Sequence, residues 1–141
     1  MLALDLGSRR IGMALSDPSG VLATPLRVLE RGRSHAADHR AVAEVVADVG
    51  AERVVVGLPL SLDGGTGPAA TAVLVEAEEL RHRLAVPVEL HDERFTTVAA
   101  HQALAAAGRG SRARRGVVDR AAAAVLLQSW LDRRRGEGDA R

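Results

Sequence analysis

Residues 2–17 read LALDLGSRRIGMALSD, and this stretch decides the fold. Two short apolar runs, 2–6 and 10–16, lie on either side of a Gly7-Ser8-Arg9 turn. A second turn, Asp17-Pro18-Ser19-Gly20, precedes another apolar run near residues 26–29. Apolar runs separated by glycine-rich and proline-rich turns are typical of strands. The N-terminal part is therefore predicted to be a meander of three strands.

Helices and strands are expected to alternate through the rest of the chain. Ser34 can cap the first helix and Gly50 can end it, and Pro68 suits the first turn of the second. The expected segments are a helix at 35–49, a strand at 53–56, a helix at 68–85, a strand at 86–90, a helix at 96–107 and a helix at 117–134. Together they predict an α/β fold with a mixed five-stranded sheet flanked by helices, an order that fits the RNase H-like fold.

Length and composition narrow the class of protein. A chain of 141 residues is the size of one domain, which we expect at 1–135, with a disordered tail at 136–141. The absence of cysteine excludes disulfides, thiolate zinc sites and a cysteine nucleophile. No signal peptide and no apolar run long enough to cross a bilayer is present. We expect a cytoplasmic protein that does not bind membranes.

The basic residues are concentrated in the last quarter of the chain. Residues 1–108 carry 10 Arg and 14 acids, a balance of −4, whereas residues 109–141 carry 9 Arg and 4 acids, a balance of +5. Arg109, Arg112, Arg114 and Arg115 lie in a segment, 109–116, that is expected to be a mobile loop. A short run of charges is more often a solvated surface, but such a loop can also neutralise the phosphates of a nucleic acid, and in a nuclease these four arginines are predicted to bind the substrate.

Asp5 is the first candidate ligand. It lies inside an apolar strand, where an isolated carboxylate is costly unless a cation neutralises it. Gly7 follows closely and lets the backbone turn beside the carboxylate. Pairing with a nearby arginine is the alternative explanation.

Two further acids are candidates. Glu93 belongs to the run His91-Asp92-Glu93-Arg94 at the end of the last predicted strand, although this run could also be an ordinary solvated loop. Asp119 begins a helical stripe that continues through Ala123, Leu126 and Trp130, so it is expected to point inward. The alternative for Asp119 is a residue that only complements the helix dipole.

The three acids can converge on one cleft. Carboxylates without thiolates are hard ligands that suit Mg²⁺ or Mn²⁺. Two such ions can activate water and stabilise the leaving oxygen of a phosphodiester. Asp5, Glu93 and Asp119 are therefore predicted to be both the metal ligands and the catalytic residues of a nuclease.

Four motifs, in order along almost the whole chain, resemble the YqgF/RuvX family of bacterial RNase H-like nucleases, often called Holliday junction resolvases. The motifs are Asp5-Leu6-Gly7-Ser8-Arg9-Arg10-Ile11-Gly12 with Ala14, Ser16 and Asp17; Val55-Val56-Gly57-Leu58-Pro59-Leu60 with Asp63-Gly64; Asp92-Glu93-Arg94-Phe95-Thr96-Thr97; and, after the arginine-rich segment, Asp119 with Ala122, Ala123, Leu127, Gln128 and Leu131. The chain departs from the family pattern at Ser61-Leu62 and at Phe95, and neither departure touches an expected ligand.

The resemblance implies the same three catalytic acids and a role in maturation of the 5′ end of the precursor to 16S ribosomal RNA. It leaves cleavage of four-way DNA junctions as the nearest rival. A nucleic-acid-binding module without catalysis is a further alternative, and an actin-like ATPase is the weakest because that fold needs two such domains.

The remaining signals are weaker. The glycine-rich loop 57–67 could offer amides to a phosphate or be only a tight connection. His91 could assist proton transfer or be structural, and Trp130 is expected in the core. The histidines are interpreted as scattered, without a helical metal pair. The charges on the second helix indicate an exposed face with no dimer surface, which favours a monomer; they are Glu76, Glu78, Glu79, Arg81 and Arg83.

Overall fold

The structure is a computed structural model. It describes the backbone of residues 1–61, 63–95 and 112–139, and the side chains of these ranges except 95, 112–119 and 137–139. The helix predicted at 96–107 lies outside the described residues. No helix in the described ranges combines the length and the apolar composition needed to cross a membrane.

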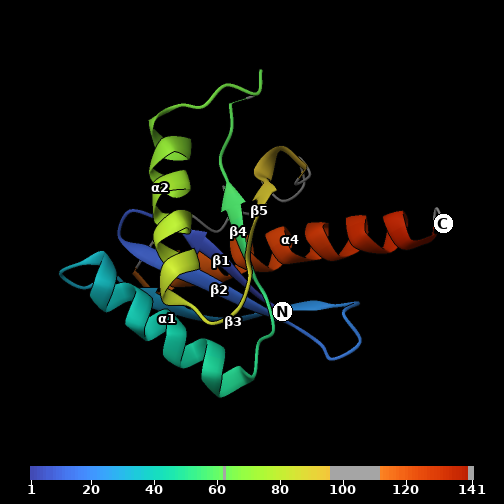
Figure 1. Cartoon of the computed structure of the whole chain (residues 1–141), viewed down its shortest axis with the longest axis horizontal. Helices are drawn as coiled ribbons and strands as arrows, with labels where there is room; N and C mark the ends of the chain where they lie inside the picture. The colour runs from blue at the N-terminus through green and yellow to red at the C-terminus, as the bar shows by residue number, and fades with distance from the viewer. Residues whose placement is uncertain (62, 96–111, 140–141) are drawn as a thin grey trace.

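A five-stranded mixed sheet forms the centre of the molecule (Figure 1), as the sequence predicted. Its strands are β1 (Leu2–Leu6), β2 (Arg10–Ser16), β3 (Ala23–Glu30), β4 (Val54–Leu58) and β5 (Val88–Asp92). The order across the sheet is β3-β2-β1-β4-β5. The meander β1-β2-β3 is antiparallel, whereas β4 and β5 run parallel to β1. The carboxyl ends of β1, β4 and β5 therefore meet at one edge.

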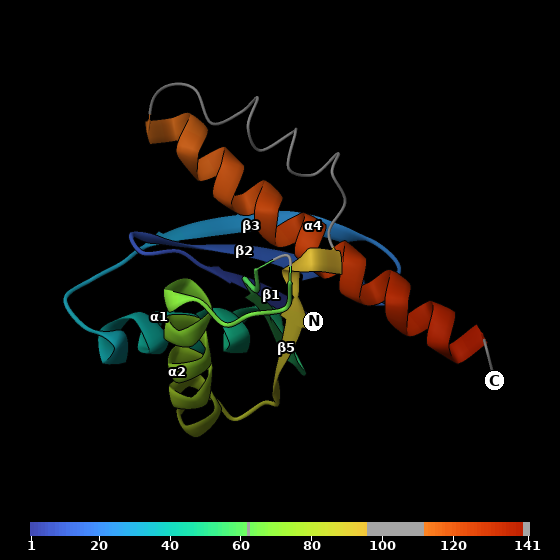
Figure 2. The same ribbon diagram turned by 90° about the horizontal axis from the view of Figure 1, so that it is seen from above.

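Helices cover both faces of the sheet (Figure 2). Helices α1 (His35–Val49) and α2 (Pro68–Arg83) lie on one face, and α4 (Arg112–Asp139) crosses the other. A short 3-10 helix, η1 (Glu93–Phe95), follows β5 directly.

Local signals define the ends of α1 as predicted. The side chain of Ser34 accepts a hydrogen bond from the amide of Ala37, which satisfies one of the free amides in the first turn. Gly50 ends the helix with φ = 65°, in the left-handed region that glycine adopts without strain.

Side chains alternate along the strands and build one core on each face. Leu2 and Leu4 of β1 pack with the residues of α1 and α2. Ala3, between them, packs on the opposite face with Ala123 and Leu126 of α4. Trp130 is 5% exposed in this second core, which confirms its predicted position. The alternation fixes which face each polar residue of a strand occupies.

The last helix is longer than predicted. It begins at Arg112, so the prediction of a mobile loop was wrong for residues 112–116, and it continues to Asp139 instead of ending near Arg134. Arginine and alanine are strong helix formers, and a single glycine such as Gly116 costs only about 1 kcal/mol inside a helix. The preference of the neighbouring residues thus outweighs the cost of Gly116, and of Gly136 and Gly138 near the other end of the helix.

Candidate active site

Asp5 lies near the carboxyl end of β1 and pairs with Gly12 of β2. Because it is two residues after Ala3, it is on the sheet face that α4 covers. The strand around it is buried at Ala3 and Leu4, and Asp5 itself is half-buried. Asp5 is thus placed at the edge of the core.

Glu93 reaches the same face from the other side of β4. It follows β5 as the first residue of η1, and its side chain crosses Gly57 of β4. A Cβ on Gly57 would lie 2.6 Å from Oε1 of Glu93, 3.2 Å from Cγ of Glu93 and 3.1 Å from Cδ2 of Leu126. Val56, one residue earlier, pairs with Leu4. The register therefore brings Asp5 and Glu93 to one edge of the sheet, with Gly57 on the strand between them.

The neighbouring acids Asp92 and Glu93 have opposite electrostatic environments. Arg94 donates hydrogen bonds to both carboxylate oxygens of Asp92, from Nε at 2.9 Å to Oδ2 and from its amide at 2.9 Å to Oδ1, and these bonds lower the pKa of Asp92. Burial raises the pKa of Glu93, and the negative charge of Asp92 raises it further. Asp92 is therefore already neutralised by its ion pair with Arg94. Glu93 is the acid whose charged form a bound cation would stabilise.

Asp119 lies in α4, but its side chain is outside the described residues. Its position in the helix is four residues before Ala123 and seven before Leu126, both buried against the sheet. Helical spacing puts these three positions on one stripe. Leu126 contacts the Gly57 region, so the stripe that contains Asp119 passes beside β4.

His91 joins β5 to α4. Its Nε2 shares a 3.0 Å hydrogen bond with Oγ of Ser129, and the residue is 7% exposed. Burial lowers the pKa of His91, and the charge of Arg133 lowers it further. From the next residue of the helix, the indole N–H of Trp130 donates to Glu89 of β5 at 3.2 Å. These contacts hold α4 against the strand that leads to Glu93.

A partly buried arginine anchors the turn after Asp5. Arg31 donates from Nε to the carbonyl oxygen of Gly7 at 2.7 Å, and its two terminal nitrogens each donate to Glu76 at 2.8 Å. Asp38 accepts a further hydrogen bond from Arg31 at 3.2 Å. The β1–β2 turn is thereby fastened to α1 and α2. This role could not be predicted from sequence, because Arg31, Gly7 and Glu76 are far apart along the chain.

Two expectations about α1 and α2 were wrong. Glu76 was expected on an exposed face, but it is 4% exposed because α2 turns it toward Arg31 and α1. The histidines were interpreted as scattered, but His35 and His39 lie one helical turn apart on α1. Their i, i+4 spacing was readable in the sequence.

The loop that connects β4 to α2 is a tight connection where it is described. The amide of Gly65 donates to the carboxylate of Asp63 at 2.8 Å, and the amide of Gly64 donates to the carbonyl oxygen of Ser61. These amides are used within the turn, which argues against a phosphate cradle at residues 64 and 65.

Nucleic-acid binding by the arginine-rich segment stays a prediction. Arg109 lies outside the described residues, and Arg112, Arg114 and Arg115 have only their backbone described, in α4.

The donor chemistry of the site fits a hard divalent cation. The described donors at this edge are carboxylates, from Asp5 and Glu93, and burial disfavours the charged form of Glu93. Oxygen donors of this kind suit Mg²⁺ or Mn²⁺.

Comparison with known sequences identifies related proteins over almost the whole chain. A family model described as "RuvX: Holliday junction resolvase" matches residues 1–133. A protein of Kineococcus radiotolerans is 52% identical over 138 residues, which cover 95% of this chain and 72% of that protein. A protein of Mycobacterium leprae (strain TN) is 49% identical over 142 residues, covering 99% and 76%. Both carry the name "Putative pre-16S rRNA nuclease".

Solved structures share the fold. RuvC of T. thermophilus in complex with a Holliday junction substrate superimposes with a TM-score of 0.56 and 16% identity, over 96% of each chain. The fowlpox virus resolvase in complex with Holliday junction DNA gives a TM-score of 0.53 and 10% identity, over 94% of this chain and 97% of that chain. These neighbours confirm the RNase H-like fold predicted from the sequence.

Proposed function

This chain belongs to the RuvX family, and we propose that it is a divalent-metal-dependent nuclease that hydrolyses phosphodiester bonds in the 5′-end maturation of pre-16S ribosomal RNA. The names of the relatives at 49% and 52% identity support the RNA substrate. The chain would act in the cytoplasm on this precursor. Similarity of fold would not be enough for such an assignment, because one fold serves many functions.

One observation carries the proposal: β1 and β5, the strands on either side of β4, bring Asp5 and Glu93 to the same edge and face of the sheet, with the carboxylate of Glu93 over Gly57 of β4. Asp5, Glu93 and Asp119 would hold the ions as Mg²⁺ or Mn²⁺. When bound, such ions supply an activated water and charge stabilisation at the leaving oxygen.

The other residues of the chain have supporting roles in this proposal. Arg94 holds Asp92 through charge-assisted hydrogen bonds, which leaves Glu93 as the acid that faces the site. Arg31 fastens the turn that follows Asp5 and so limits the movement of its carboxylate. Arg109, Arg112, Arg114 and Arg115 would bind substrate phosphates.

Cleavage of four-way DNA junctions is the second candidate. The description of the matching family names Holliday junction resolvase activity, so this alternative shares the same acids and the same metal requirement. A binding module without catalysis would need none of the three acids.

The test of the proposal is a cleavage assay with the purified chain and an end-labelled RNA that spans the 5′ end of 16S rRNA and its precursor extension. We expect cleavage with Mg²⁺ or Mn²⁺ and none with EDTA. Tight RNA binding without cleavage in either metal would support the non-catalytic module. Equal cleavage in EDTA would refute the metal dependence.

A further inference from the structure

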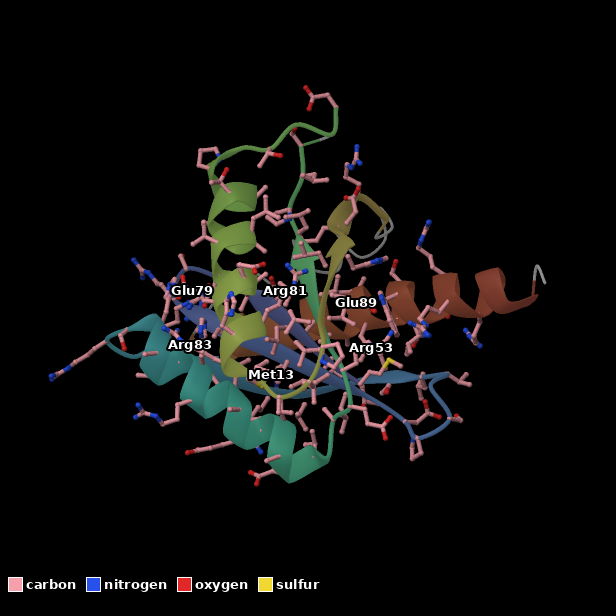
Figure 3. The ribbon with its side chains drawn as sticks, in the orientation of Figure 1. Met13, Arg53, Glu79, Arg81, Arg83 and Glu89 are labelled. Atoms are coloured by element: carbon pink, nitrogen blue, oxygen red, sulfur yellow. The ribbon has the colours of Figure 1, made fainter. Side chains whose placement is uncertain are left out.

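A cluster of histidines and glutamates lies between α1 and α2, on the sheet face opposite α4. His35 and His39 are one turn apart on α1, and Glu76 and Glu79 are nearly one turn apart on α2. Figure 3 labels Glu79 on α2, beside the start of α1. None of the three proposed catalytic acids belongs to this cluster.

The two pairs of side chains face each other across the interface between the helices. Nε2 of His39 is 2.8 Å from Oε2 of Glu76, and Nδ1 of His35 is 3.1 Å from Oε1 of Glu79. Ligand atoms of His35, His39 and Glu76 all lie within 4.8 Å of one another. The side chain of His39 is fully buried and that of Glu76 is 5% exposed, so two of the three donors are held in place by packing.

We propose that His35, His39 and Glu76, with Glu79 as a fourth ligand, form a binding site for a borderline transition metal of the Zn²⁺ class. Imidazole nitrogen suits Zn²⁺, Co²⁺ and Ni²⁺ better than Mg²⁺, and two nitrogens with two carboxylates complete a tetrahedral set. Donors from one turn of each of two facing helices are a common way to build metal sites in helical packings. Zinc bonds are about 2.0–2.1 Å long, so the ligand atoms must move closer together when the ion binds. The side chain of His35 is 48% exposed and is free to make this movement.

The charges around the cluster favour a cation. Arg31 and Arg83 contribute two positive charges, whereas Asp38, Glu76 and Glu79 contribute three negative charges. With both histidines neutral, the net charge of these groups is −1. A divalent ion offsets this negative charge and stabilises the buried carboxylate of Glu76. Arg31 remains paired with Glu76 and orients it as a ligand.

Arg83 must move when the ion binds. In the described structure its Nη1 donates to Nδ1 of His39 at 2.8 Å, so the proton of His39 is on Nε2 and is donated to Glu76. Coordination through Nε2 moves that proton to Nδ1, which then cannot accept from Arg83. The side chain of Arg83 is 40% exposed and already contacts Glu79, so it can rotate into solvent. The proton stays on the ring, and none is lost from the site.

A cavity provides the path for the ion. It has a volume of about 290 Å³ and is lined by His35, Arg31 and Glu76, with Gly7 and Ser8 on another wall. Two of the four proposed ligands therefore border a space large enough for a hydrated ion. Glu79 and His35 complete the site at the exposed end of the helix pair.

Metal titrations test this site apart from the proposed nuclease centre. The full chain carrying Asp5→Asn and Glu93→Gln is freed of metal by a chelator and titrated with Zn²⁺ by calorimetry and with Co²⁺ by visible absorption. We expect one ion per chain and the intense visible bands of tetrahedral Co²⁺. Adding His35→Ala should weaken Zn²⁺ affinity by at least about tenfold, because even outer-shell changes can cost that much.

His82→Ala is the matched control, since His82 lies on α2 with its side chain 79% exposed and is paired with Glu78, outside the proposed ligands. It should leave the affinity unchanged. If the double variant does not fold, wild type in excess Mg²⁺ takes its place. Absence of Zn²⁺ binding, or binding that His35→Ala and Glu79→Gln both leave intact, would overturn the proposal.

Discussion

The carboxylate of Glu93 lies directly over Gly57, with Oε1 only 2.6 Å from the point that a Cβ on Gly57 would occupy. Real Cβ atoms are not found so close to another heavy atom, so any side chain at residue 57 must displace Glu93 or Leu126. The glycine is thus part of the site without contributing a functional group. Because residue 57 has no side chain, Glu93, which follows β5, has room to lie over the neighbouring strand β4.

Gly57→Ala should therefore reduce cleavage strongly while the chain remains folded. A catalytic group that is misplaced by about 1 Å can cost 10²-fold in rate, and we expect a loss of at least about tenfold. The measurement is the rate of metal-dependent RNA cleavage at saturating metal, with circular dichroism as the check on folding. Gly136→Ala is the control, because a Cβ there meets nothing within 4 Å. Full activity of Gly57→Ala would show that the position of Glu93 is not critical.

Asp5→Asn, Glu93→Gln and Asp119→Asn should each nearly abolish cleavage. These changes remove the charge of a metal ligand but almost none of its volume, so the folded domain should persist. Cleavage is measured across a range of Mg²⁺ and Mn²⁺ concentrations. Asp132→Asn provides the comparison, since Asp132 is an exposed carboxylate on α4 that pairs with Arg135. A variant that keeps near-wild-type turnover would lose its assigned role.

The sequence predicts the framework well because local signals define it. The apolar run 2–6, the Ser34 cap and the Gly50 stop each act on neighbouring residues, and the structure confirms all three. The placement of Asp5 and Glu93 at one edge follows from strand order. Long-range contacts were not predictable in this way. The contact of Glu93 with Gly57 and the hydrogen bond from Arg31 to Gly7 depend on tertiary packing. The spacing of residues along the chain does not predict them.

Glu76→Gln should destabilise the metal-free protein in a pH-dependent way. Burial raises the pKa of Glu76, but hydrogen bonds from Arg31 and His39 outweigh it and leave the pKa below the usual value of 4.5. A carboxyl with a depressed folded-state pKa stabilises the fold above its unfolded pKa, and this stabilisation is lost as the pH falls through the folded value. The free energy of unfolding should drop by about 3 kcal/mol near pH 7, the typical cost of breaking a buried ion pair.

The difference in the free energy of unfolding between wild type and Glu76→Gln is measured by urea unfolding in EDTA, from pH 7 down to pH 3. It should shrink below about pH 4.5, as protonation removes the ion pair from the wild type too. Glu78→Gln is the matched change on the exposed side of α2, where an ion pair with Arg81 should contribute less than about 1 kcal/mol. A loss for Glu76→Gln that does not change with pH would show that its charge is unimportant.

Replacing Arg112, Arg114 and Arg115 with alanine should weaken RNA binding and flatten its salt dependence. Each phosphate contact that is lost should lower the slope of log affinity against log salt by about 0.7 to 0.9. Binding is measured by fluorescence anisotropy at several salt concentrations. A triple alanine variant of the exposed Arg27, Arg33 and Arg40 controls for the loss of three charges. Equal slopes in both variants and wild type would show that Arg112, Arg114 and Arg115 do not contact the RNA phosphates.

The choice between RNA and four-way DNA depends on how many active sites act together. Symmetric resolution of a junction needs two sites at a fixed separation, which a chain with one such site supplies only as a dimer. The large apolar side chains that are exposed in the described part of the chain are Val21 and Leu22 before β3, and Leu74 and Val75 on α2. Two exposed apolar pairs on separate elements are less than a stable dimer interface normally requires.

We therefore predict single-site cleavage of precursor RNA by a monomer. One metal site beside an arginine-rich segment can engage a flexible strand, and single strands are the form in which RNA is most easily recognised. Precursor RNA and a four-way DNA junction are compared at matched concentration and salt, while light scattering measures the mass of the protein in the same buffer. The Asp5→Asn variant controls for contaminating nucleases on both substrates. Paired symmetric cuts in the junction by a stable dimer, with the RNA left intact, would establish the resolvase instead.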